Sequence, residues 1–229
     1  MTRDELARAI EYIRTRREVW EVILSGGDPL VLPPRKIAEI IEALGAIDHV
    51  RVVRVHTRVP VMDAARITRE MTSALRHSKL TTYVVLHTNH VRELSLQARE
   101  ACARIVDAGI PMLAQTVLLR GVNDDPNTLA ELFRELVVLR VKPYYLHHGD
   151  LAVGTSHFRT SLAEGQSIMK ELRRSLSGIA QPTYVLDIPG GFGKVPVGPQ
   201  YVGTEDGRGR REVEDPWGRK HSYPPVDQE

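Results

Sequence analysis

Strand-like and helix-like segments alternate along almost the whole chain, and this alternation restricts the fold more than any other feature. Short β-branched runs are followed by a turn and then by a longer stretch with helical periodicity. The expected strands are Trp20–Ser25, Val50–His56, Thr82–His87, Met112–Leu118, Pro143–His147 and Thr183–Asp187. The expected helices are Asp4–Arg16, Pro34–Leu44, Ala65–Ser78, Leu94–Ala108, Pro126–Arg140 and Ser161–Leu176.

Helices of this length between successive strands are typical of parallel βαβ units, so the sequence predicts an α/β fold. The unbroken series of six strands favours a barrel or a partial barrel of the TIM type. A doubly wound sheet is the alternative, because the spacing of strands does not fix their order in the sheet. We expect one domain over residues 1–202 and a polar tail over residues 203–229, which forms a small hairpin or is frayed.

The composition argues against several classes of protein. Hydrophobic residues make up 42% of the chain and charged residues 26%, which is the balance of a globular protein with a sizeable core. The net charge of +2 does not favour a nucleic-acid partner, and no apolar run is long enough to span a membrane. The N-terminus lacks the apolar core of a signal peptide, so we expect a cytoplasmic protein. The single cysteine, Cys102, cannot build a disulfide framework, a zinc site or an iron–sulfur cluster within this chain.

Polar residues gather where the expected strands end, which is where barrels place their chemistry. They are Ser25 to Asp28, Thr57 and Arg58, His87 to His90, Gln115, His147 to Asp150, and Asp187. Each of them would be ordinary alone. Their shared position predicts an active site at the C-terminal ends of the strands.

Two glycine-containing segments follow these strand ends. In the turn from Ser25 to Pro29, paired glycines let a ligand approach the backbone, whose N–H groups can bind a carboxylate or orient an amine. In the loop from Asp187 to Lys194, the lysine can reach into a cavity and form a Schiff base with an aldehyde such as pyridoxal 5′-phosphate (PLP). The plainer interpretations are a tight βα turn and a surface lysine in a flexible loop.

The acidic and histidine side chains at the strand ends allow two further interpretations. Asp150 and Asp187 form a pair of carboxylates that could hold a cation or a proton, or each could cap a following helix. A metal site could be built from His87, His90, His147 and His148. A metal-dependent barrel hydrolase would use the first three of these histidines together with Asp150. Strand-end histidines more often serve as hydrogen-bonding or core residues.

Taken in order, the motifs resemble the lysine 2,3-aminomutase family of radical S-adenosylmethionine (SAM) enzymes, including its YodO-like branch. The matching stretches are residues 21–30, 55–60, 87–90, 115–124, 142–146, 157–160, 181–184 and 187–196. They begin with EVILSGGDPL and end with DIPGGFGKVP. The resemblance runs from about Asp4 to Val202, and as a set the motifs are highly specific.

The resemblance implies a partial TIM-type barrel with a [4Fe–4S] cluster, SAM and PLP. In this family, reduction of SAM generates a 5′-deoxyadenosyl radical, which takes a hydrogen atom from C3 of an amino acid held as a PLP aldimine. The amino group then moves from C2 to C3, so the expected activity is that of an isomerase, an L-lysine 2,3-aminomutase. The expected partners are a small basic amino acid, an external one-electron reductant and a second copy of the chain, with neither nucleic acid nor membrane.

Residue by residue, the resemblance assigns Lys194 to the covalent capture of PLP, and Asp150 and Asp187 to the distal ammonium of the substrate. The residues that it implies for SAM are Ser25, Gly26, Gly27, Asp28, Arg58, His87 and Gln115. Two carboxylates favour lysine as the substrate, because burying an ammonium group is costly without opposite charge close by. A glutamate-specific relative would need a cation or neutral donors at these positions.

One part of the family pattern is missing. The family places a Cys-x3-Cys-x2-Cys loop, with basic residues that help to bind the PLP phosphate, just before the helix that begins near Asp4. This sequence contains no such segment, so we expect a chain truncated at its N-terminus, without its first strand and cluster loop, and inactive as written. A non-catalytic, degenerate barrel that binds PLP is the remaining alternative.

Overall fold

The computed structural model describes residues 2–224 of the chain. Its helices are α1 (Arg3–Arg14), α2 (Pro34–Gly45), α3 (Val59–Met62), α4 (Arg69–Leu75), α5 (Leu96–Asp107), α6 (Pro126–Val138) and α7 (Leu162–Ser175). Its strands are β1 (Glu21–Leu24), β2 (Val52–Thr57), β3 (Thr81–His87), β4 (Met112–Val117), β5 (Val141–His147), β6 (Thr183–Asp187), β7 (Lys194–Pro196), β8 (Val202–Glu205), β9 (Arg211–Glu214) and β10 (Lys220–Tyr223). Single turns of 3₁₀ helix connect several of these elements.

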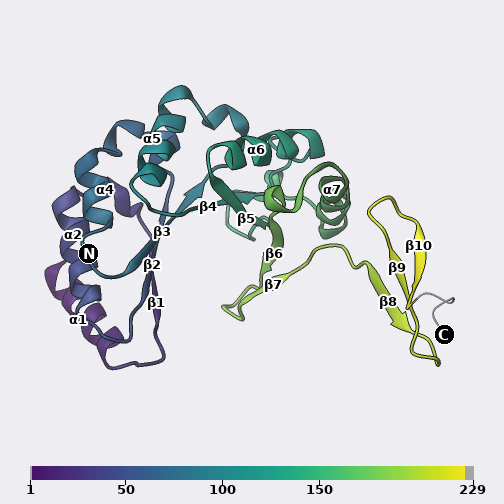
Figure 1. Ribbon diagram of the computed structural model, residues 1–229, viewed down its shortest axis with the longest axis horizontal. Coiled ribbons are helices and arrows are strands. Elements are labelled where there is room, and N and C mark those ends of the chain that lie inside the picture. Colours follow the sequence, from purple (N-terminus) through teal and green to yellow (C-terminus); the bar gives the residue numbers. More distant parts are fainter. Residues whose placement is uncertain (1, 225–229) are drawn as a thin grey trace. The chain divides into compact units, whose positions relative to one another are not determined.

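Strands β1 to β7 form one sheet whose order follows the chain, β1-β2-β3-β4-β5-β6-β7 (Figure 1). The pairs β1–β2, β2–β3, β3–β4 and β5–β6 are parallel, and β7 turns back antiparallel to β6. A doubly wound sheet would reverse its strand order at a switch point, and this sheet does not. The sequential order confirms the prediction of a partial barrel of the TIM type.

The chain divides into two compact units, Met1–Gln115 with Leu136–Lys142 and Thr116–Glu135 with Pro143–Glu229. In the first unit, helices α2, α4 and α5 lie on one side of strands β1 to β3 (Figure 1). Burial alternates along β2, because successive side chains of a strand point to opposite faces. Val53 and Val55 are fully buried, whereas Arg54 and His56 on the other face are partly exposed.

The apolar face of α2 explains why this helix lies on the sheet. Its buried residues are Ile37, Ile40, Ile41, Leu44 and Gly45. Complete burial of one aliphatic side chain contributes roughly 1.5–3 kcal/mol. The helix side of the first unit therefore holds its apolar core, and the polar strand residues are left on the opposite face.

Several helices differ from the sequence prediction at their ends, and α1 and α4 also stop two and three residues earlier than expected. Helix α4 was expected from Ala65 but begins after Thr68, whose side chain caps it by accepting a hydrogen bond from the backbone N–H of Met71 at 3.2 Å. Helix α5 begins two residues late, after the capping residue Ser95. Helix α6 ends at Val138, and Arg140 takes a left-handed backbone conformation with φ of 61°, which a helix cannot continue through.

In the second unit, β6 packs closely against α7. Tyr184 of β6 is buried and lies against Gly165 of α7, where an added Cβ atom would overlap the phenol ring. The strand after the glycine-rich loop, β7, was not predicted from the sequence. It pairs with β6 in the register that sets Lys194 opposite Asp187.

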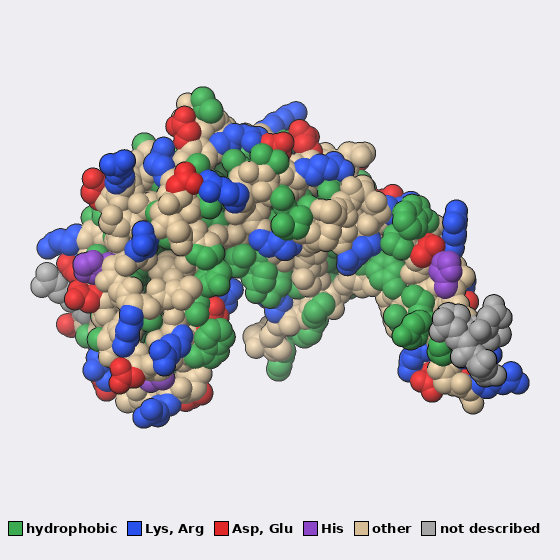
Figure 2. All heavy atoms as spheres, viewed as in Figure 1, with side chains coloured by type: hydrophobic (Ala, Val, Ile, Leu, Met, Phe, Trp, Pro, Cys, Tyr) green, Lys and Arg blue, Asp and Glu red, His purple; other side chains and the backbone are tan. Residues whose placement is uncertain are grey.

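Residues 202–223 form a separate antiparallel sheet in the order β10-β9-β8. Helix α7 contacts it, because Lys170 Nζ lies 2.7 Å from Glu214 Oε1. Trp217, Val202 and Tyr223 are exposed, and Figure 2 shows hydrophobic side chains on the surface of this sheet. Strands β9 and β10 lie where the hairpin was expected, β8 was not expected, and the domain boundary at residue 202 stays a prediction. No helix among residues 2–224 has both the length and the apolar character that a membrane span requires.

Candidate functional site

The first unit contains a cavity of about 660 Å³ at the C-terminal ends of β1, β2 and β3. Its lining residues are Ser25, Gly26, Asp28, Val31, His56, Thr57, Arg58, Val59, Met62, Asp63, Arg66 and His87. Five of the seven residues that the sequence suggested for SAM are among them. Their position at the strand ends agrees with the place where barrels of parallel strands bind ligands.

The Ser25–Asp28 turn leaves open space in front of its backbone. Gly26 has φ of 105°, a conformation that L side chains rarely adopt. A Cβ atom added at Gly26 or at Gly27 would meet no other atom within 4 Å. The two glycines are therefore not needed to avoid a clash within the protein, and the space they leave could admit a ligand to the backbone N–H groups.

The carboxylate of Asp28 joins the ends of two strands. It accepts hydrogen bonds from the backbone N–H of Arg58 at 2.6 Å, from the Thr57 hydroxyl at 2.8 Å and from the backbone N–H of Leu30 at 3.0 Å. These bonds tie the turn after β1 to the turn after β2. Asp28 therefore shapes the wall of the cavity, and its oxygen atoms are largely occupied by the protein itself.

Three other predicted SAM residues also have protein partners. The guanidinium of Arg58 forms an ion pair with Glu93 at 2.7 Å, so a ligand carboxylate would compete with Glu93 for it. The side chains of His87 and Gln115 contact one another across the parallel pair β3–β4, where they are register partners. The rings of His56 and His87 lie 5.6 Å apart. Sequence reasoning did not include His56 among the cavity residues.

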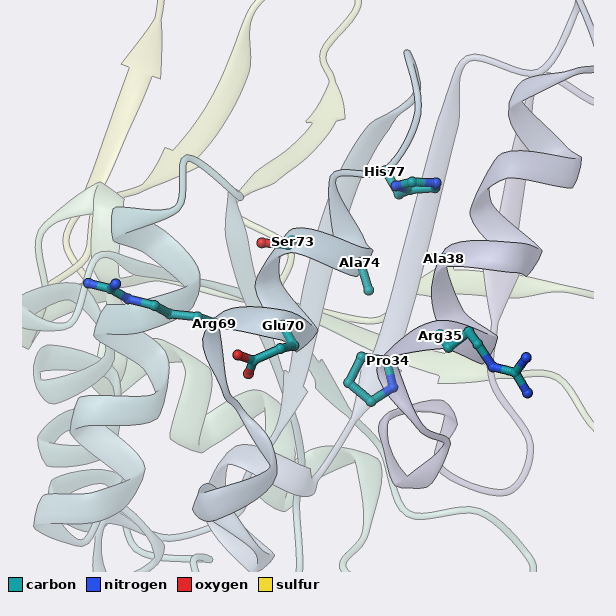
Figure 3. A pocket seen from close by; sticks show the side chains of 8 residues that line it. All are labelled: Pro34, Arg35, Ala38, Arg69, Glu70, Ser73, Ala74 and His77. Carbon is teal, nitrogen blue, oxygen red and sulfur yellow. The ribbon is translucent and has the colours of Figure 1, made fainter.

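A smaller hollow of about 350 Å³ lies between α2 and α4. It is lined by Pro34, Arg35, Ala38, Arg69, Glu70, Ser73, Ala74 and His77 (Figure 3). In Figure 3, the side chains of Arg35 and Arg69 extend away from one another. None of the predicted site residues lies here, and the charged groups do not converge on a common point.

In the second unit, three side chains at the ends of β5, β6 and β7 meet. Lys194 Nζ lies 2.5 Å from both carboxylate oxygens of Asp187. His147 Nδ1 lies 3.1 Å from Asp187 Oδ2 and 3.2 Å from Lys194 Nζ. The β6–β7 hairpin produces this arrangement, because Asp187 and Lys194 are opposite one another in its register.

The loop of this hairpin explains its glycines. Gly190, Gly191 and Gly193 have φ values of 90°, 80° and 102°, which glycine adopts without strain. The backbone N–H of Ile188 donates to the carbonyl of Gly193 at 2.8 Å and closes the loop. The glycine-rich segment thus serves to return the chain, and it presents Lys194 on an ordered strand and not in a flexible loop.

Burial and charge within the cluster shift two pKa values. Burial and the neighbouring Lys194 ammonium lower the pKa of His147, although the hydrogen bond with Asp187 acts in the opposite direction. Burial raises the pKa of Asp187, but hydrogen bonds from Lys194 and His147 outweigh this effect, and its pKa lies below the ordinary value. Near neutral pH, Asp187 is therefore ionised and His147 is mainly uncharged.

Asp150 and His148 follow β5 beside this cluster. Burial lowers the pKa values of both His147 and His148, and the negative charge of the exposed Asp150 offsets only part of this effect. His148 Nδ1 lies 2.7 Å from the hydroxyl of Tyr184. Burial, and then the negative charge of Glu164, raise the pKa of Tyr184 to about 12, so its phenol stays protonated.

The histidines do not converge in the way a metal site requires. Within the described part of the chain, no group of three or more His, Cys, Asp and Glu side chains could hold a metal ion. His90 instead caps a 3₁₀ turn by accepting from the backbone N–H of Arg92. Cys102 is buried in α5, and burial raises the pKa of its thiol to about 11. Residues 2–224 therefore do not fit a [4Fe–4S] cluster, which needs thiolate ligands.

Comparison with known proteins gives one consistent family. Residues 1–133 match the Radical SAM superfamily, and residues 169–208 match a family described as Lysine-2,3-aminomutase. An L-lysine 2,3-aminomutase of Fusobacterium nucleatum is 44% identical over 202 residues, covering 88% of this chain and 47% of that protein. A glutamate 2,3-aminomutase of Clostridioides difficile is 40% identical over 197 residues, covering 86% of this chain and 46% of that protein.

Solved structures agree on the fold. The crystal structure of Streptococcus suis SuiB bound to S-adenosylmethionine matches with a TM-score of 0.57 at 12% identity, covering 82% of this chain and 44% of that chain. The chain spans about half the length of the curated relatives it matches. The superfamily match covers more than half of the chain, and the Fusobacterium nucleatum aminomutase aligns with 88% of it. The chain therefore belongs to the radical SAM superfamily and, within it, to the lysine 2,3-aminomutase family.

Proposed function

We propose that the chain forms the SAM- and PLP-binding part of an L-lysine 2,3-aminomutase, an isomerase that moves the 2-amino group of lysine to C3. The observation that carries the proposal is the meeting of Lys194, Asp187 and His147 at adjacent strand ends, with Asp150 beside them. An amine that captures an aldehyde and carboxylates that bind a distal ammonium are the two functions that this reaction needs in one place. Cytoplasmic location and self-association belong to the same proposal.

The second unit fits PLP through Lys194. Its Nζ would hold the aldehyde carbon of PLP covalently, and the cofactor would supply a conjugated ring that stabilises an unpaired electron on the substrate. The chain's own contribution is positional. The ordered hairpin holds the amine at the strand ends, and Asp187 holds it through charge-assisted hydrogen bonds until the cofactor arrives.

The first unit fits SAM through the cavity at the ends of β1 to β3. The open backbone at Gly26 and Gly27 would bind the polar end of SAM, and Arg58 would exchange its Glu93 partner for the SAM carboxylate. Radical SAM enzymes also hold a [4Fe–4S] cluster, for which residues 2–224 offer no thiolate set. The cluster and the external one-electron reductant would therefore come from outside these residues.

The acidic side chains favour lysine over glutamate as the substrate. Asp187 contacts Lys194, and the charge of Asp150 acts on the neighbouring His147, so a carboxylate-bearing side chain would be repelled by both aspartates. Similarity alone does not decide the substrate, because the lysine and glutamate enzymes resemble the chain at 44% and 40% identity. Charge complementarity at the distal end of the substrate is the better guide.

Covalent trapping tests the proposal. The purified chain is incubated with PLP and reduced with borohydride, and the modified residue is identified by peptide mass spectrometry. We expect modification at Lys194 and its loss in Lys194→Ala. Lys170→Ala is the matched control, because Lys170 is also a partly exposed lysine paired with a carboxylate in the second unit. Random labelling of lysines, unchanged in Lys194→Ala, would overturn the proposal.

A further inference from the structure

We propose that His147 accepts the proton that Lys194 must lose before its amine can capture an aldehyde. The inference rests on the proposed function, because it concerns the attachment of PLP to Lys194. It adds a residue to which neither the sequence nor the comparisons gave a role in this reaction.

The geometry places one nitrogen atom between two partners. His147 Nδ1 is within hydrogen-bonding distance of Lys194 Nζ, at 3.2 Å, and of Asp187 Oδ2, at 3.1 Å. Nδ1 can accept a proton from the ammonium or donate one to the carboxylate, but it cannot do both at once. The cluster therefore has two arrangements of the same proton, and in both the positive charge lies beside Asp187.

The other ring nitrogen, Nε2, carries the proton in the tautomer that leaves Nδ1 able to accept one. His147 Nε2 is buried and has no hydrogen-bond partner among the described residues. The hydrogen bonds of the ring are therefore made through Nδ1, toward Lys194 and Asp187. A histidine with a purely structural role would be expected to use both nitrogens when buried.

The surroundings of the ring keep it uncharged near neutral pH, which leaves it able to accept a proton. The groups that face His147 are Asp187 from β6, Lys194 from β7, Asp150 from the segment after β5, and Tyr145, whose ring lies 5.6 Å away edge-on. Burial and the Lys194 ammonium keep the pKa of His147 below its usual value, so the ring is mainly neutral. In the tautomer that carries its proton on Nε2, the lone pair of Nδ1 faces Lys194 Nζ. When the proton comes from Lys194, the lysine becomes neutral and no longer repels the positive charge on His147.

The step balances without another reactant. The proton moves from Lys194 Nζ to His147 Nδ1, and the freed electron pair forms the C–N bond to the aldehyde carbon of PLP. The aldehyde oxygen leaves as water with the two protons that remain on the nitrogen. After the transfer, Nδ1–H can donate to Asp187 Oδ2, which lies 3.1 Å away, and the carboxylate compensates the new charge on His147.

The pH dependence of PLP capture tests the inference. The transfer moves one proton from Lys194 to His147 and releases none to solvent. The capture rate of the wild-type chain should therefore become independent of pH as the pH falls from 8 toward 6.5. In His147→Asn, the ammonium proton must go to solvent, and the rate should fall roughly tenfold per pH unit over the same range. His148→Asn is the matched control, because His148 pairs with Tyr184 and not with Lys194, and it should keep the wild-type profile.

A measurement without the cofactor separates this inference from the proposed function. Reductive methylation of Lys194 by formaldehyde, followed by peptide mass spectrometry, should show the same levelling in the wild-type chain and its loss in His147→Asn. If both chains bind PLP at Lys194 with identical pH profiles, the inference is wrong and the proposed function stands. If formaldehyde labelling shows the levelling but PLP never attaches to Lys194, the proton transfer stands and the proposed function is wrong. Matching circular dichroism spectra would establish that the variants fold.

Discussion

Replacement of Lys194 by methionine should allow the cofactor-free chain to bind free lysine more tightly. In the cofactor-free state, the Lys194 ammonium occupies both oxygens of Asp187, which is the position proposed for the distal ammonium of the substrate. Methionine keeps most of the length and apolar surface of the side chain but removes its charge. The substrate then no longer competes with an internal cation.

The size of the effect follows from the exposure of the pair. The side chains of Lys194 and Asp187 are 30% and 40% exposed, so solvent screens their attraction. A screened pair contributes about 1 kcal/mol, and charge-assisted hydrogen bonds in a partly buried pair contribute up to about 2 kcal/mol. Removal of the competing ammonium should therefore increase the affinity for lysine roughly fivefold to thirtyfold.

Isothermal titration calorimetry of lysine into the two cofactor-free chains measures this difference. Norleucine, which lacks the distal amine, should show no gain, and Lys170→Met should behave as wild type because Lys170 pairs with Glu214. Equal lysine affinities for the wild-type chain and Lys194→Met would refute the reasoning. A gain of the same size with norleucine would also refute it, because the effect would then be one of packing and not of charge.

Three further predictions concern stability. Gly165→Ala should destabilise the chain by about 1–3 kcal/mol in chemical denaturation, because the new methyl group would overlap Tyr184, and an unchanged midpoint would contradict this packing. In Asp187→Asn, the free energy of unfolding should fall less steeply at acidic pH than in the wild-type chain. The folded pKa of Asp187 lies below its ordinary value of 3.8, so the stability that its carboxylate contributes is present above pH 3.8 and is lost as the pH falls through the folded pKa. An equally steep loss of stability in the variant and in the wild-type chain would contradict the pairing of Asp187 with Lys194 and His147. Asp28→Ala should lower stability by about 1–2 kcal/mol and weaken SAM binding, measured by thermal shift with and without SAM, because the backbone N–H of Arg58 and the turn lose their acceptor. Full SAM affinity in this variant would show that the tie between the two strand ends is not needed.

The six parallel strands were predicted within a few residues, because their signals are local. Each is a run of β-branched or aliphatic residues with a glycine, proline or polar turn at its end. Helix ends were less accurate, since a capping residue such as Thr68 competes with the apolar pattern that surrounds it. The family resemblance added the identity of the fold, which the strand spacing alone had left between a barrel and a doubly wound sheet.

The candidate site was predicted as a set of residues but not as a set of contacts. β7 is three residues long and follows a glycine-rich loop, so no periodic pattern predicted the strand that pairs Lys194 with Asp187. The role of Asp28 was expected at SAM, whereas its carboxylate is bonded mainly to the turn after β2. His147 was considered as a metal ligand, and only its distances to Lys194 and Asp187 suggest another role. The contacts of His147 join residues 40 and 47 apart in the chain, and those of Asp28 join residues 29 and 30 apart, separations that local sequence does not encode.

The hairpin between β6 and β7 makes the length of the loop from residue 188 to residue 193 as important as its glycines. Side chains alternate between the two faces of a strand, so inserting or deleting a single residue here would rotate the lysine at the start of β7 to the opposite face. The amine would then point away from Asp187 although every chemical group was still present. Members of the family that keep this chemistry should therefore tolerate exchanges at the exposed Phe192, but not a change in the number of residues between the aspartate and the lysine.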